Sequence, residues 1–250
     1  MSSKSDKRER FNRIELSQRW VRAQVGGEFV VDCKRPLLVW EHEKYPTYFF
    51  PREDVRMDWL QETGQTSSRT FWNLTVNGQH VERAAYHYPH QPELEGYITL
   101  PWHKVDRWFE EEEEVFVHAR DPYKRVDVMP SSRHVRVVID GVTVAETERP
   151  FLLFETSLPT RYYIPAADVN LAYLTPTDSH TRCPYKGIAS YWNVSIGDKV
   201  YKDLVWSYPD PIAECPKIKG LLCFFNEKID LYVDGELQAR PETYWSFDGR

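Results

Sequence analysis

The stretch His134-Val-Arg-Val-Val-Ile-Asp-Gly-Val-Thr-Val-Ala145 decides the fold class of this 250-residue chain. Its apolar residues alternate with other positions on both sides of Asp140-Gly141, and such alternation is the pattern of a half-buried β-strand. Asp-Gly between two strands favours a type I′ hairpin, because both turn residues must adopt a positive φ. The stretch therefore predicts an antiparallel β-hairpin.

The same pattern occurs once more, 114 residues earlier in the chain. When residues 21–60 are laid on residues 135–174, thirteen of the forty positions are identical, among them Gly27/Gly141 and Glu41/Glu155. Further along, the offset becomes 120, as at Trp72/Trp192. Because the period is too long for a solenoid, the chain is predicted to be a tandem duplication of a domain of about 100 residues.

Short strands, not helices, account for the apolar pattern of both copies. We predict a mostly β fold of two small tandem barrels or folded sheets, joined by an ordered linker. The predicted segments are a flexible tail (1–16), a first β domain (17–118), a linker (119–134), a second β domain (135–236) and a C-terminal arm (237–250).

The composition excludes several classes of partner. A net charge of −6 and a pI of about 5.8 argue against nucleic acid as the main partner, since binding phosphates needs a basic surface. We expect the acidic run Glu110–Glu114 to be solvated surface. Residues 1–10 do not resemble a signal peptide, and no apolar run approaches the ~20 residues of a membrane-spanning helix. We therefore expect a cytoplasmic protein with reduced thiols and no membrane partner.

The two copies differ most between Ser68 and Phe71. The first copy has two residues there, Arg69 and Thr70, whereas the second copy has eight, Cys183–Ser190. One copy therefore has a segment, rich in reactive side chains, that the other lacks. This difference directs the search for a site to the second copy.

Cys183 and Lys186 are the candidate catalytic residues of that segment. Pro184 and Gly187 predict a tight turn that folds Lys186 back toward the thiol, and a nearby ammonium favours the nucleophilic thiolate, with Arg182 adding to the effect. The alternative is that Cys183 is a small apolar turn residue and that Lys186 points into solvent. His134 and His180 are the candidate bases.

Arg161 is a candidate ligand-binding residue, together with Tyr162 beside it. Its counterpart in the first copy is Thr47, and an arginine among aromatic rings can hold a carboxylate or phosphate through two hydrogen bonds. The alternative is a salt bridge, with Glu155 as a possible partner. Because neither Arg161 nor Lys186 has a counterpart in the first copy, we expect alanine at either position to cost little stability.

Three further residues complete the candidate ligand-binding set. Glu155 recurs as Glu41, which favours a buried hydrogen-bonding role before an acid–base one. Tyr191 and Trp206 lie on neighbouring predicted strands, and Trp206 either lines a pocket or belongs to the core. Trp192 recurs as Trp72 and is predicted to be core.

Three stretches of the second copy resemble the tandem form of the domain of unknown function 427 family. They are 154–165, 181–192, which contains Cys-Pro-Tyr-Lys-Gly, and 206–209, and the resemblance extends from about residue 20 to residue 240. It implies a compact β-tent-like domain, a fold shared with zinc-binding proteins and with some methionine sulfoxide reductases.

The resemblance does not bring a cofactor with it. The zinc-binding relatives hold their metal with cysteine pairs, and the four cysteines here form no Cys-x-x-Cys pair, so no metal or other cofactor is carried over. A nucleotidyltransferase-style label used for the family finds no support, because no glycine-rich phosphate loop and no suitable carboxylate pair is present.

The sequence thus predicts that the first copy is a structural or gating partner and that the second holds any working site. The expected function is binding of a small anionic organic compound, with thiol-dependent catalysis at Cys183. The alternative from a different class is a non-catalytic protein-interaction or scaffold module.

Overall fold

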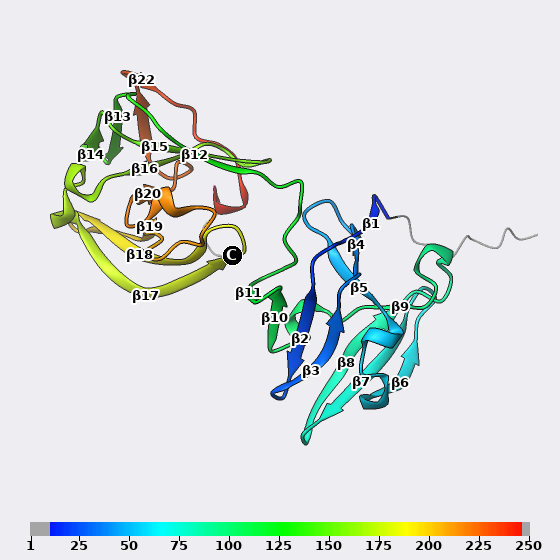
Figure 1. Cartoon of the computed structure of the whole chain (residues 1–250). Helices are drawn as coiled ribbons and strands as arrows, with labels where there is room; N and C mark the ends of the chain where they lie inside the picture. The colour runs from blue at the N-terminus through cyan, green and yellow to red at the C-terminus, as the bar shows by residue number, and fades with distance from the viewer. Residues whose placement is uncertain (1–10, 247–250) are drawn as a thin grey trace, which may run out of the picture. The chain divides into compact units, whose positions relative to one another are not determined.

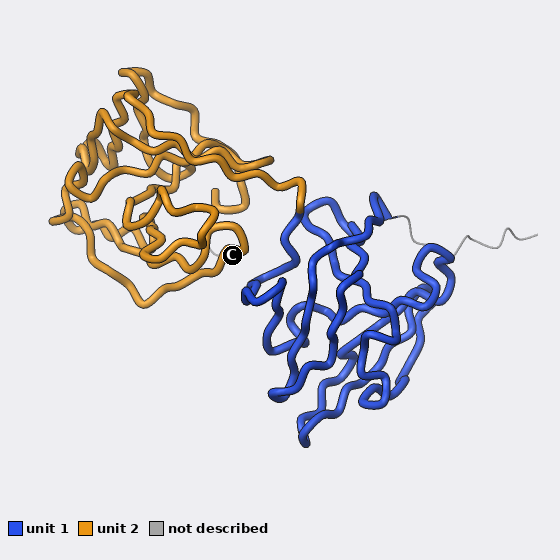
Figure 2. The backbone as a smooth tube through the Cα atoms, in the orientation of Figure 1, with its two compact units in different colours: residues 1–121 blue, residues 122–250 orange. Residues whose placement is uncertain are grey.

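The computed structural model describes residues 11–246 and divides the chain into two compact units, residues 1–121 and residues 122–250 (Figure 2). Both units consist of antiparallel strands with short 3₁₀ turns, and the described residues contain no α-helix. The predicted mostly β fold with two tandem domains is confirmed. Within the described residues, no helix is long and apolar enough to cross a bilayer.

The first unit contains three antiparallel sheets, ordered β1-β4-β5-β9, β11-β10-β2-β3 and β6-β7-β8. Its strands are β1 (Ile14–Leu16), β2 (Val21–Val25), β3 (Glu28–Cys33), β4 (Leu37–Val39), β5 (Thr47–Pro51), β6 (Leu60–Gln65), β7 (Thr70–Val76), β8 (Gln79–His87), β9 (Tyr97–Ile98), β10 (Arg107–Glu110) and β11 (Glu113–Val115). Its 3₁₀ turns are η1 (Arg52–Asp54), η2 (Met57–Trp59), η3 (Pro92–Leu94) and η4 (Trp102–Lys104).

The second unit contains a seven-stranded sheet, ordered β12-β15-β16-β20-β19-β18-β17, and a four-stranded sheet, ordered β14-β13-β21-β22 (Figure 1). Its strands are β12 (Val126–Pro130), β13 (Val135–Ile139), β14 (Val142–Thr147), β15 (Phe151–Glu155), β16 (Arg161–Ile164), β17 (Leu174–Cys183), β18 (Gly187–Ile196), β19 (Lys199–Ser207), β20 (Leu222–Phe224), β21 (Asp230–Val233) and β22 (Glu236–Leu237). Its 3₁₀ turns are η5 (Ala166–Asp168), η6 (Leu171–Tyr173), η7 (Pro216–Ile218) and η8 (Tyr244–Ser246).

A side-chain hydrogen bond and a backbone angle recur at matching positions of the two units, 120 residues apart. Asn73 Oδ1 accepts from the Arg83 backbone N at 2.9 Å, and Asn193 Oδ1 accepts from the Asp203 backbone N at the same distance. Arg83 and Asp203 adopt nearly equal positive φ angles of 48° and 47°. The duplication is therefore visible in backbone geometry as well as in sequence.

The predicted hairpin turns are present. Asp140 and Gly141 have φ angles of 48° and 78°, and Gly26 and Gly27 have 59° and 84°, as a type I′ turn requires. The Asp140 turn connects β13 to β14, and the glycine pair connects β2 to β3.

Two segment boundaries need correction. Residues 14–16 of the expected tail form β1, which pairs with β4, and residues 126–130 of the expected linker form β12, which pairs with β15. Each segment adds an edge strand to a sheet. Sequence periodicity does not predict pairing between segments that lie far apart in the chain. Residues 1–10 of the tail and 247–250 of the arm lie outside the described residues.

Two predictions about burial were also wrong. Trp72 and Trp192 are only partly buried, at the margins of the two main cores. Glu110, expected on a solvated surface, is 5% exposed, while Glu111–Glu113 are exposed. The alternation of β10 explains this, because it turns Trp108 and Glu110 to the inner face.

Candidate functional site

The segment that distinguishes the second copy forms the tip of the β17–β18 hairpin at the edge of the seven-stranded sheet. Cys183 ends β17 opposite Gly187, and the Lys186 backbone N donates to the Cys183 carbonyl at 3.3 Å. Gly187 has a φ of +107°, which favours glycine. The predicted tight turn is present, and it is closed by Cys183 and Lys186.

A second insertion in the same copy meets this hairpin tip. The offset between copies rises from 120 at Pro89/Pro209 to 124 at Pro92/Pro216, where the matching turns η3 and η7 begin. The extra residues lie against the tip, since the Ile212 backbone N donates to the Lys186 carbonyl at 3.1 Å.

The second insertion also brings another thiol to the site. The Cys215 backbone N donates to the Ile212 carbonyl at 3.0 Å, so the segment that is bonded to Lys186 also positions Cys215. Cys215 belongs to the buried cluster against which Cys183 packs. The alignment of the two copies at the Cys183 segment gave no signal for this residue.

Lys186 is paired inside the protein. Its Nζ donates to Glu155 Oε2, and the two side chains are 12% and 6% exposed. Burial alone would lower the pKa of Lys186, but nearby Cys183 and Glu155 outweigh it and hold the pKa above its ordinary value. Lys186 therefore does not point into solvent, and it remains an ammonium at neutral pH.

Cys183 is the most accessible thiol of the chain. It is partly buried, whereas Cys33, Cys215 and Cys223 are fully buried, and all four are free. Burial raises the pKa of Cys215 to about 11, although Lys186 opposes the rise, and burial raises the pKa of Cys223 to about 12. The other thiols are thus held in the unreactive protonated form.

The candidate bases have partners of their own. His134 Nε2 lies 2.8 Å from Glu146, and His180 Nδ1 lies 3.0 Å from the Asp178 carbonyl. Alternation along β17 turns His180 and Arg182 away from the face of Cys183. The expectation that Arg182 adds to the effect of Lys186 stays a prediction.

Arg161 is held by a partner that the sequence did not indicate. Its Nη1 and Nη2 donate to the Glu227 carboxylate at 2.7 Å each, and the side chains are 8% and 0% exposed. The Trp245 ring centre lies 5.4 Å from the guanidinium carbon, and Thr243 Oγ1 donates to Glu227 at 2.5 Å. The C-terminal arm thus covers a closed ion pair, and Glu155 is not the partner of Arg161.

The aromatic candidates lie in different places. Trp206 is 7% exposed and donates from Nε1 to the Tyr163 hydroxyl at 3.1 Å. Tyr191 packs on the same cluster, with its hydroxyl 2.7 Å from Thr181 Oγ1. Tyr162 packs on the other core of the unit, because alternation along β16 turns it away from its neighbours. Trp206 and Tyr191 therefore share the side of Cys183, and Tyr162 does not.

The first copy carries a similar carboxylate centre. Glu41 accepts from the Tyr86 hydroxyl at 2.8 Å and from the Tyr88 hydroxyl at 2.5 Å, and Arg69 Nη2 lies 3.6 Å away. Arg69 thus supplies the cation that Lys186 supplies in the second copy, although its sequence position differs. The alignment contained this signal, since Arg69 is one of the two residues that remain in the gap.

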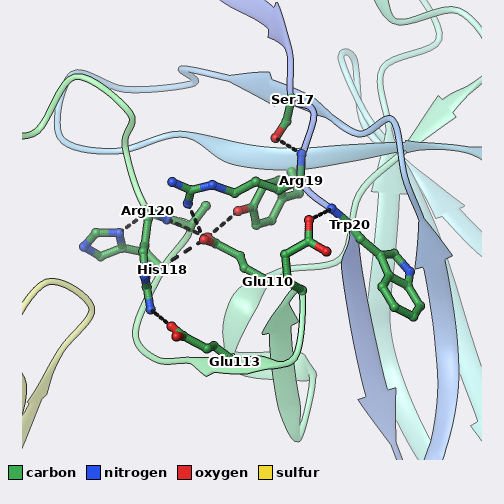
Figure 3. A network of polar contacts seen from close by, with 10 residues as sticks. Ser17, Arg19, Trp20, Glu110, Glu113, His118 and Arg120 are labelled. Carbon is green, nitrogen blue, oxygen red and sulfur yellow. Dashed lines mark hydrogen bonds and ion pairs between the residues drawn. The ribbon is translucent and has the colours of Figure 1, made fainter. Parts of the chain in front are cut away.

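Glu110, which is 5% exposed, is the centre of a polar network in the first unit (Figure 3). Its carboxylate accepts from Arg19 and from the Tyr48 hydroxyl, the latter at 2.5 Å. Arg120 adds a backbone bond of 3.3 Å to the same carboxylate, and its guanidinium lies 3.1 Å from Glu113 (Figure 3). The network fastens the end of the first unit to β5 and β10, which indicates a structural role.

Neither Cys183 nor Lys186 lines the clefts beside Asp168, Tyr88 and Tyr201. The side chains of the candidate site are turned inward and packed. The site is therefore a compact thiol–ammonium–carboxylate cluster around one partly buried cysteine.

The comparison with known proteins agrees with the repeat. A family model for the domain of unknown function 427 matches residues 13–111 and, separately, residues 127–235. The chain belongs to this family. No curated protein matches it. The two matched segments correspond to the two structural units, so each unit is one copy of the family's domain.

Proposed function

We propose that the second domain carries a thiol site in which Cys183 acts as a nucleophile toward a small electrophilic compound. One observation carries the proposal. The two segments that are present only in the second copy meet each other, and they bring Cys183 beside the buried Lys186–Glu155 pair. An ammonium held close to a thiol stabilises the thiolate, which is the reactive form.

The sequence predicted an anionic compound, but we propose that the negative charge of the compound contributes little to its binding. Both cations that could hold an anion, Arg161 and Lys186, are engaged by buried carboxylates. The compound that the site accepts is therefore defined mainly by its reactivity toward a thiolate. In this proposal the ammonium of Lys186 stabilises the thiolate of Cys183 and does not bind the ligand.

The test is competitive alkylation of the folded, full-length protein with iodoacetamide at pH 7, followed by peptide mass spectrometry. Cys183 should react before Cys215 and Cys223. Lys186→Met should slow alkylation of Cys183 by about fivefold, the factor that corresponds to ~1 kcal/mol of lost stabilisation. Lys199→Met is the matched control, because Lys199 forms an exposed pair with Asp140.

A further variant separates charge from folding. Lys186→Met alone leaves the buried Glu155 with only the longer contact to Lys124, whose Nζ lies 3.6 Å from Oε1, so the double variant Lys186→Met/Glu155→Gln removes both charges of the Lys186–Glu155 pair together. If the ammonium activates the thiol, alkylation stays slow in the double variant. Equal alkylation of Cys183 in the wild type and in both variants would contradict the proposal.

The scaffold alternative is favoured by one observation, the burial of Lys186 in an ion pair with Glu155, with the two side chains 12% and 6% exposed. Under that alternative the cluster only fastens the hairpin tip. The same experiment discriminates, because a purely structural Cys183 should react no faster than its partial exposure allows and should not respond to the charge of Lys186.

A further inference from the structure

A cleft of about 850 Å³ opens in the first domain, the copy for which the sequence predicted a structural or gating role. Its wall is built from η1, the end of β8 and the loop that leads to η3. Arg52, His87 and Tyr88 line it. The corresponding positions of Arg52 and His87 in the second copy are Ala166 and Ser207, so the cleft is chemically specific to the first copy.

Arg52 presents a guanidinium without an acidic partner among the described residues. Its Nε is buried and lacks a hydrogen-bond partner, and its guanidinium carbon lies 5.6 Å from the Trp72 ring centre. A buried donor without an acceptor is uncommon in native proteins. Arg52 as a whole is only partly buried and lines the cleft, so the remaining N–H groups of its guanidinium are donors that a ligand can use.

His87 adds a second donor of defined tautomer. Trp72 Nε1 donates to His87 Nδ1 at 3.2 Å, so the proton of the neutral ring is on Nε2. Burial and the charge of Arg52 lower the pKa of His87, with Glu62 opposing, and the ring is neutral at pH 7. Trp72 thus contacts both residues and sets their positions.

The acidic groups near the cleft leave these donors available. Glu95 lines the cleft and Glu62 acts on His87, but both residues are exposed, and neither forms an ion pair with Arg52 within the described part of the chain. We propose that the cleft binds a small organic compound through a carboxylate or phosphate group, held bidentately by Arg52 and by the Nε2–H of His87. Arginine is suited to this task by its planar fork of donors.

The experiment titrates the full-length protein with benzoate and, separately, with inorganic phosphate, by calorimetry. Arg52→Met keeps the aliphatic stem over Trp72 and removes the fork. The matched control is Arg56→Met, since Arg56 also lies over a tryptophan ring, that of Trp59, but is paired with Asp58 at the surface. We expect saturable binding of at least one anion, weakened tenfold or more in Arg52→Met and unchanged in Arg56→Met.

Two further measurements make the result decisive. By NMR, the bound anion should raise the pKa of His87, because it offsets the charge of Arg52. Arg52→Lys retains the charge without the fork, so it should fold and still bind more weakly than the wild type. The proposal is overturned if neither anion binds, if Arg52→Met binds as tightly as the wild type, or if the His87 resonance does not respond. Preference for one anion identifies the ligand class.

Discussion

Glu227→Gln is the substitution that best tests how the second domain is held together. The carboxylate accepts two bonds of 2.7 Å from Arg161 and one of 2.5 Å from Thr243, and the ion pair is almost fully buried. Replacing the carboxylate by an amide leaves the Arg161 guanidinium buried without a counter-charge. Breaking a buried pair in this way costs ~3–5 kcal/mol.

That magnitude is a large part of the stability of a single domain, which is about 5–15 kcal/mol. The melting midpoint of the second unit should fall by roughly 10–20 °C. Arg161→Ala should lower the free energy of unfolding by a similar amount, because it leaves the Glu227 carboxylate buried without its counter-charge. The loss is smaller only if Glu227 takes up a proton or is reached by water. The expectation that Arg161 can be replaced at little cost, which its absence from the first copy supported, is therefore replaced by the opposite prediction.

The assay is thermal and urea unfolding of the full-length protein, with Asp168→Asn as the matched control. Arg149 and Asp168 share the same bidentate geometry, with bonds of 2.9 and 2.8 Å, but Arg149 is 67% exposed. Exposed pairs contribute little, so the control should melt close to the wild type at pH 7. If Glu227→Gln and Asp168→Asn shift the midpoint equally, burial does not decide the cost and the reasoning is refuted.

The pH dependence provides a second check on the same pair. Burial raises the pKa of Glu227, but hydrogen bonds from Arg161 and Thr243 outweigh it and leave the pKa below its ordinary value of 4.5. A lowered folded-state pKa gives stability that is present above pH 4.5 and is lost as the pH falls through the folded pKa. The difference between the wild type and Glu227→Gln should therefore shrink on acidification.

Two further predictions concern the turn and the carboxylate of the first copy. Gly187→Ala should destabilise the second unit by ~1–3 kcal/mol, because φ is +107° and the added Cβ would lie 3.3 Å from the Asp210 carbonyl oxygen. The control is Gly141→Ala, which has open space around it and should lower the stability less in the same urea titration. Glu41→Gln should destabilise the first unit by ~1–3 kcal/mol through weakened bonds to two tyrosine hydroxyls, and an unchanged urea midpoint would show that the centre contributes nothing.

The sequence by itself determined the features that depend on neighbouring residues. Alternation of apolar positions predicted the strands, because successive side chains of a strand point to opposite faces. Asp140-Gly141 predicted its turn, because few residue pairs adopt two positive φ angles at low cost. The duplication and the hairpin tip at Cys183 and Lys186 followed from comparing one copy with the other, which needs no knowledge of contacts.

Tertiary structure decided which charged groups meet. Arg161 and Glu227 are 66 residues apart, and Lys186 and Glu155 are 31 apart, so no local pattern pairs them. Strand order and register bring them together, and burial then requires that each charge find a partner, since an unpaired charge in the interior is costly. Arg52 forms no such ion pair among the described residues, and its place over the Trp72 ring of β7 likewise depends on tertiary packing.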